Sequence, residues 1–166
     1  MPCYLKEVDV VPEVAKFQSA LIVPCRFCPA VSLAVRNNQP FIKLYRRHLK
    51  TECYEDYIEN LQFRLEKEGV KTEVFRSSIL NYAHCMWSPR KRNKLLKRIS
   101  EFEAVVVIGC EAAYESVRDL SESTDCQVFN GMESVGLLNV TPKLDWPFYI
   151  SLELSGVTRL HHQNIE

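Results

Sequence analysis

The sequence predicts an α/β fold of three layers, with a mostly parallel sheet of about four to five strands between two layers of helices. Short apolar runs of strand length alternate along the chain with longer segments in which apolar residues recur every three or four positions. One run, EAVVVIG at residues 103–109, contains an unbroken Val/Ile stretch, which is typical of a strand buried on both faces of a parallel sheet. Strands that alternate with helices form βαβ units, and these units place helices on both faces of their sheet.

Local signals set the elements of the first half. A first strand is expected at residues 18–23, and a helix follows at residues 30–36, because Pro29 suits a first helical position. Residues 54–68 repeat apolar side chains at intervals of three and four, which predicts an amphipathic helix, and Gly69 supplies its C-cap.

The second half continues the same alternation. Its expected elements are a strand at residues 71–75, a helix at 89–100 with Ser88 as N-cap, the strand at 103–109, a helix at 111–120, a strand at 127–129, a short helix at 132–139 and a last strand at 148–154. This order of elements is typical of Rossmann-like and flavodoxin-like proteins. No pattern assigns residues 38–53.

Length and composition indicate an ordinary globular protein. The 166 residues are interpreted as a single domain, with an N-terminal extension at residues 1–17 and a polar tail at residues 155–166. Lys plus Arg and Asp plus Glu are equal at 21 each, so no net charge favours nucleic acid or an anionic membrane. The N-terminus lacks the apolar stretch of a signal peptide, and a cytoplasmic location is expected. In a reducing compartment, seven cysteines are better explained as ligands, reactive thiols or core residues than as disulfides.

Four cysteines follow predicted strands. Cys25 and Cys28 come directly after the first strand, Cys85 lies in the loop after the second, and Cys110 follows the third. The carboxyl ends of parallel strands meet at one edge of the sheet, where ligands bind. Four thiolates can hold zinc or a [4Fe–4S] cluster. The sequence therefore predicts a metal site made by these four cysteines.

The remaining cysteines have less favourable positions. Cys126 lies at the amino end of a strand, which is the opposite edge of the sheet, and is interpreted as a core residue. Cys3 lies near a terminus, where disorder is common. Cys53 lies in the unassigned segment and could replace Cys85, and His84 could replace the thiol of its neighbour as a ligand.

Two further residues at the same edge are candidates for cofactor binding. Gly131 and Glu133 follow the fourth predicted strand, and a glycine there allows the backbone to approach a ligand closely. The alternative is a left-handed turn that only ends the strand.

The cysteine pattern resembles a known family. A strand that ends in Cys-x-x-Cys, a lone cysteine after the next strand and a buried strand that runs into Gly-Cys are similar to the cysteine-rich domain associated with anaerobic methylenetetrahydrofolate reductases. The matching text is LIVPCRFCPAVSLAV, HCMW, FEAVVVIGCEAAYESVRDL and QVFNGMESVGLLNV, within residues 18–140. The resemblance implies an iron–sulfur or zinc site on Cys25, Cys28, Cys85 and Cys110, a supporting role in anaerobic one-carbon or electron-transfer metabolism, and a redox or one-carbon enzyme as protein partner.

Two other functions remain open. The CRFCP segment lies between a strand and a helix, as the thiols of a thiol–disulfide oxidoreductase do, and NVTP at residues 139–142 could supply a proline facing it. A small-ligand-binding module would use Gly131 and the basic segment at residues 90–98. That segment carries six basic residues, but its apolar residues predict a solvated helix with one buried side, so no nucleic-acid partner is expected.

Overall fold

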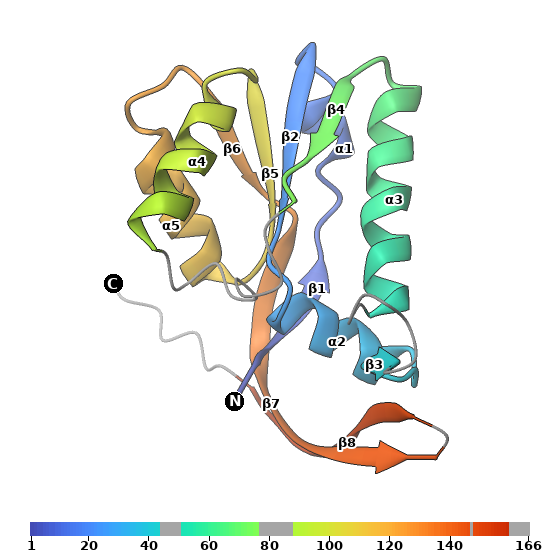
Figure 1. Ribbon diagram of the computed structural model, residues 1–166. Helices are drawn as coiled ribbons and strands as arrows, with labels where there is room; N and C mark the ends of the chain where they lie inside the picture. Colours follow the sequence, from blue (N-terminus) through green and yellow to red (C-terminus); the bar gives the residue numbers. More distant parts are fainter. Residues whose placement is uncertain (44–50, 77–87, 147, 160–166) are drawn as a thin grey trace.

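The computed structural model describes residues 1–43, 51–76, 88–146 and 148–159, whose strands form two four-stranded sheets (Figure 1). One sheet is parallel and the other is antiparallel. In chain order the elements are β1 (Cys3–Glu7), α1 (Val11–Val14), β2 (Ser19–Pro24), α2 (Cys28–Arg36), β3 (Ile42–Lys43), α3 (Glu52–Lys67), β4 (Lys71–Val74), α4 (Pro89–Ile99), β5 (Ala104–Ile108), α5 (Glu111–Ser121), β6 (Gln127–Asn130), β7 (Met132–Asp145) and β8 (Tyr149–Arg159).

The parallel sheet confirms the α/β class that the sequence predicts. Its strand order is β4-β2-β5-β6, and all neighbours run parallel. Every residue of β5 is fully buried, as its unbroken apolar run predicts. The chain builds β4 on one side of β2 and then crosses to β5 on the other side, so the strand order reverses between β2 and β5. Ligands of doubly wound sheets bind in the crevice at such a reversal.

Helices cover both faces of this sheet, with α3 on one side and α4 and α5 on the other (Figure 1). Two of these helices begin or end at the capping residues that the sequence predicts. The Ser88 hydroxyl accepts a hydrogen bond from the Lys91 amide at the start of α4. Gly69 follows α3 with φ of +88°, a left-handed conformation that a glycine adopts without strain. The basic helix α4 buries Leu95 and Ile99, which confirms that one of its sides faces the core.

The antiparallel sheet corrects the predicted architecture, since the chain is not a single three-layer sandwich around one parallel sheet. Its order is β1-β7-β8-β3. The short helix predicted at residues 132–139 is wrong, because those residues begin β7. Burial there alternates with a period of two, which is the pattern of a strand with one covered face. Gly136 also requires close packing, because a Cβ there would lie 2.7 Å from the Thr158 carbonyl oxygen of β8.

The antiparallel sheet includes both ends of the described chain. β1 lies within residues 1–17, which are interpreted from the sequence as an extension. It pairs with β7, and its Leu5 side chain is buried. The last predicted strand, at residues 148–154, is part of β8 and pairs with β7 and β3 rather than with the parallel sheet. The outer parts of β7 and β8 project from the body as a two-stranded ribbon (Figure 1).

Candidate metal centre

Three cysteine side chains converge beside the carboxyl ends of β2 and β5. The Sγ atoms of Cys3, Cys28 and Cys110 all lie within 4.8 Å of one another. Each cysteine comes from a different place in the fold, namely β1, the first residue of α2 and the residue that precedes α5. A group of three thiols at such distances could hold a metal ion.

The topology of the parallel sheet brings Cys28 and Cys110 together. β2 and β5 end side by side, since Pro24 pairs with Ile108, and the Cys25 amide extends the ladder by donating to the Ile108 carbonyl at 2.8 Å. The chain then enters α2 at Cys28 and α5 just after Cys110, which is the N-cap of that helix. Both helices therefore begin at the point where the strand order reverses.

Cys3 reaches this point because β1 packs against α2 (Figure 1). The Ser32 hydroxyl of α2 accepts a hydrogen bond from the Leu5 amide at 3.0 Å and donates one to the Cys3 carbonyl at 3.1 Å. The sequence does not predict Cys3 as a ligand, because residues 1–17 are interpreted as an extension. The sequence of β1 gives little indication of a strand, since β1 has five residues and Leu5 is its one buried side chain.

A carboxylate joins the helix that follows Cys110 to the antiparallel sheet. Glu111, the first residue of α5, accepts hydrogen bonds from the Ser134 amide at 2.9 Å and from the Ser134 hydroxyl. Ser134 is buried on β7, and its hydroxyl also hydrogen-bonds with the Cys3 thiol. Glu111 and Ser134 thus position Cys110 and Cys3 relative to each other.

The three thiols differ in their affinity for a proton. Hydrogen bonding from Cys28 lowers the pKa of Cys110 to about 6, and the backbone amides of Ala112 and Ala113 contribute in the same direction against the effect of burial. The hydrogen bond to Cys110 raises the pKa of Cys28. Burial and the charge of Cys110 raise the pKa of Cys3. At neutral pH the site without metal therefore holds one thiolate and two neutral thiols.

The spacing of the sulfur atoms suits a single metal ion. Two thiolates on one tetrahedral zinc ion, each about 2.3 Å from the metal, lie about 3.8 Å apart. Small rotations of the three side chains would bring sulfur atoms that already lie within 4.8 Å to that spacing. Cys110 is only 6 % exposed, so the thiolate that starts the site is shielded from water.

Two of the four predicted ligands belong to this group, and Cys25 does not. The Cys25 side chain is 2 % exposed and belongs to the hydrophobic core. Its backbone is held on both sides, because its amide donates to β5 and its carbonyl accepts from the Tyr54 hydroxyl at 2.7 Å. Cys85 and its neighbour His84 lie outside the described residues.

Cys53 and Cys126 lie apart from the group of three. Cys53 is buried in the first turn of α3, where burial raises its pKa. Cys126 immediately precedes β6, at the amino edge of the parallel sheet, as the sequence predicts. It lines a cavity of about 500 Å³ there with Phe17 and Phe102, and burial raises its pKa to about 11. The cysteines that the structure describes are all free thiols.

Gly131 and Glu133 lie where β6 passes into β7, and their part in cofactor binding stays a prediction. The Gly131 amide donates to the Val107 carbonyl at 2.8 Å, and its carbonyl accepts from the Val8 amide at 3.0 Å. A Cβ at Gly131 would lie 3.3 Å from Val106, so a glycine fits the close approach of two strands. Its φ is not positive, so the alternative of a left-handed turn is wrong, and the chain passes directly from β6 into β7. Glu133 is exposed on β7, opposite Lys6 of β1.

The proline of the NVTP segment does not lie in a turn that faces the cysteines. Pro142 lies within β7, paired with Leu152 in the part of the ribbon where most residues are exposed.

Comparisons with known proteins found no match. No family model matches the sequence, and neither a curated protein nor a solved structure matches it. Among the segments that the structure describes, no helix has the length and apolar character needed to cross a membrane.

Proposed function

We propose that the protein binds one zinc ion through Cys3, Cys28 and Cys110. The observation that carries this proposal is the convergence of three sulfur atoms within 4.8 Å from three separate elements. Chance core packing of cysteines does not require their sulfur atoms to meet at one point. Structural zinc sites are built in this way, from thiolates that tertiary structure brings together.

Zinc fits the spacing better than an iron–sulfur cluster does. In a [4Fe–4S] cluster each cysteine binds a different iron and the sulfur ligands point away from a common centre, so they lie further apart than ligands of one ion. Sulfur atoms that all lie within 4.8 Å are compatible with one shared ion.

The surroundings of the thiols support metal binding at neutral pH. The lowered pKa of Cys110 provides one thiolate for the first metal–sulfur bond. Metal binding then replaces the protons of Cys28 and Cys3, as it does at thiolate sites in general. Ser134 and the amides at the start of α5 supply hydrogen bonds around the sulfur atoms, and such outer contacts orient ligands.

Three thiolates leave the fourth position of a tetrahedral ion for another ligand. Cys85 stays a prediction from the sequence for that position. The broader role also stays a proposal: an accessory metal protein in anaerobic one-carbon or electron-transfer metabolism, with a redox or one-carbon enzyme as partner. It is supported by the resemblance within residues 18–140.

Metal analysis tests the proposal directly. The full chain is purified without oxygen, loaded with zinc and freed of excess metal, and the zinc bound per chain is measured. We expect one zinc per chain, and we expect Cys110→Ser, Cys28→Ser and Cys3→Ser each to lose it. Cys126→Ser is the matched control, because that thiol lies at the opposite edge of the sheet, and it should keep the zinc. Full zinc loading of all three variants would contradict the proposal.

The same series separates the alternatives. Cys25 and Cys85 are predicted as ligands from the sequence but are not in the group of three. The variants Cys25→Ser and Cys85→Ser test whether they bind the metal. Cobalt in place of zinc should give a thiolate-to-metal absorption band that disappears in Cys110→Ser. A brown protein that contains iron and inorganic sulfide would replace the zinc site with a cluster.

Thiol–disulfide exchange is the second candidate function, and one observation favours it. Cys110 has a lowered pKa beside Cys28, which is the pairing of a nucleophilic thiolate with a resolving thiol. The reactive pair would then be Cys28 and Cys110 rather than the Cys25 and Cys28 of the sequence prediction. Reduction of a disulfide substrate by the zinc-free protein, abolished in Cys110→Ser, would support this function.

A further inference from the structure

The open edge of the parallel sheet at β4 carries a second feature, independent of the cysteines. Among the strands of the described residues, β4 pairs with β2 alone. The Lys71 amide donates to the carbonyl of Gln18, the residue before β2, and the Phe75 amide donates to the Ile22 carbonyl of β2, each at 2.8 Å. Because successive residues of a strand point their backbone groups to opposite sides, the amides of Thr72 and Val74 point away from β2. These groups are available to a further strand.

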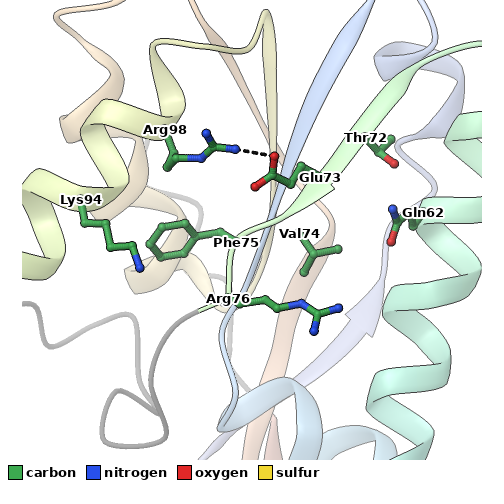
Figure 2. A pocket seen from close by; sticks show the side chains of 8 residues that line it. All are labelled: Gln62, Thr72, Glu73, Val74, Phe75, Arg76, Lys94 and Arg98. Carbon is green, nitrogen blue, oxygen red and sulfur yellow. Dashed lines mark hydrogen bonds and ion pairs between the residues drawn. The ribbon is translucent and has the colours of Figure 1, made fainter.

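A groove of about 430 Å³ follows this open edge. Its lining consists of consecutive residues of and just after β4 and of residues from the helices on either side: Gln62, Thr72, Glu73, Val74, Phe75, Arg76, Lys94 and Arg98. Figure 2 shows Val74 and Phe75 pointing to opposite sides of β4, with Gln62 of α3 on one side and Lys94 of α4 on the other. The groove therefore surrounds the edge of the strand itself rather than one face of the sheet.

The groove has an excess of positive charge. Glu73 forms an ion pair with Arg98, as Figure 2 shows, and Arg98 also pairs with Glu101. Arg76 and Lys94 are both exposed, and neither forms an ion pair with another residue that the structure describes. Two cations thus remain available beside unpaired strand amides.

We propose that this groove binds an extended, acidic segment of a partner protein, which adds to β4 as a fifth strand of the parallel sheet. In strand addition the backbone hydrogen bonds supply affinity, and alternate side chains supply specificity. Acidic side chains at neighbouring positions of the segment would lie on opposite faces of the sheet, one toward Lys94 beside α4 and the other toward Arg76 on the side of α3. A second copy of the chain fits less well, because residues 71–76 carry two basic residues and one acidic residue, so a second copy of this edge would bring more positive charge to the groove.

Synthetic peptides test the proposal on the full chain. The probes are the fluorescently labelled peptide TEEVEET, which carries glutamates on both faces of a strand, and its neutral counterpart TQQVQQT, and binding is followed by fluorescence anisotropy. We expect the acidic peptide to bind about tenfold more tightly, since it adds two partly exposed ion pairs to the same backbone contacts. The difference should shrink at high salt, which screens these pairs. Equal binding of the two peptides would overturn the proposal.

Charge reversal assigns the binding to the groove. Arg76→Glu and Lys94→Glu should each abolish the preference for TEEVEET. Lys97→Glu is the matched control, because this exposed lysine lies on the same helix outside the groove, and it should keep the preference. Unchanged binding to Arg76→Glu and Lys94→Glu would overturn the proposal. So would a single-stranded RNA oligonucleotide that displaces the acidic peptide and binds more tightly, because the cations would then belong to a nucleic-acid site.

Hydrogen exchange distinguishes strand addition from simple attraction of charges. With bound TEEVEET, the amides of Thr72 and Val74 should exchange more slowly, whereas surface attraction alone would leave them unchanged. Val74→Pro removes one outward amide without removing a bond to β2, and proline is tolerated on the free side of an edge strand. This variant should weaken both peptides equally. Unprotected β4 amides in the peptide complex would overturn the strand-addition proposal.

Discussion

The two sheets of the molecule are stabilised in different ways. In the parallel sheet, all of β5 and five of the six residues of β2 are buried. In the antiparallel sheet, β7 alternates between buried and less buried residues as far as Leu138 and is mostly exposed beyond it, and β8 has no buried residue. The parallel sheet is therefore a core with two covered faces. The antiparallel sheet is attached by the inner half of β7 and, at the outer end of β8, by β3 and the half-buried Leu152. The exposed positions of its outer half add little to the core.

The candidate metal centre lies where these two units meet. Cys28 and Cys110 follow strands of the parallel sheet, whereas Cys3 belongs to the antiparallel sheet. A bound ion would therefore connect the two units directly, in addition to the hydrogen bonds of Ser32 and Ser134. The inner half of the antiparallel sheet should contribute to stability and to the site, and the exposed positions of the outer ribbon should contribute to neither.

The largest expected effect is that of Leu5→Ala. Leu5 is fully buried on β1, and removing a buried leucine side chain costs about 2–5 kcal/mol. Leu154→Ala is the matched change on β8, where the side chain is 45 % exposed, and it should change stability by less than about 0.5 kcal/mol. Urea unfolding of the two variants measures the difference. Equal losses would show that the ribbon is as integral to the fold as β1.

A smaller loss is expected for Gly136→Ala in the inner half of β7. The new Cβ would lie 2.7 Å from a backbone oxygen of β8, so the strands must separate, at a cost of about 1–3 kcal/mol. Gly156→Ala is its control, because a Cβ there has open space around it. A melting temperature for Gly136→Ala that matches the control would mean that the two strands adjust freely.

Ser32→Ala should cost about 1–2 kcal/mol, because it leaves the buried Leu5 amide without a partner. It also releases the Cys3 carbonyl, so zinc affinity should fall together with stability. Ser155→Ala, on an exposed position of β8, should change neither quantity. Zinc affinity that stays at the native value in Ser32→Ala would show that β1 keeps Cys3 in place without this hydrogen bond.

The same difference between the sheets explains what the sequence could predict. Each element from β2 to β6, apart from the two-residue β3, matches a predicted element to within about two residues, because buried strands and amphipathic helices carry periodic patterns. β1 has only five residues, and β7 follows β6 with no turn residue in a left-handed conformation. Neither feature leaves a clear local signal, and the pairing of β1 with β7 depends on contacts between distant segments.

The site was predictable to the same extent. The rule for the edge of a parallel sheet identifies Cys28 and Cys110, since both follow buried strands. Cys3 depends on the pairing of β1, so no local pattern reveals it. The spacing of Cys25 and Cys28 suggests a shared ligand, but the Cys25 amide continues the ladder of β2 while Cys28 begins a helix. The two side chains are therefore set by different backbone conformations.

The smallest effect is expected at the tip of the ribbon. Trp146 is 86 % exposed, and its ring contacts that of Phe148 with centroids 5.3 Å apart. Trp146→Ser removes this contact but opens no cavity, so stability should change by less than about 0.5 kcal/mol and zinc binding should not change. Removing an exposed aromatic side chain should instead raise the solubility of the protein, since exposed apolar groups promote association. A loss of stability comparable to that of Ser32→Ala would mean that Trp146 packs onto the body, and the distinction between a stabilising inner half and exposed outer positions of the ribbon would then be wrong.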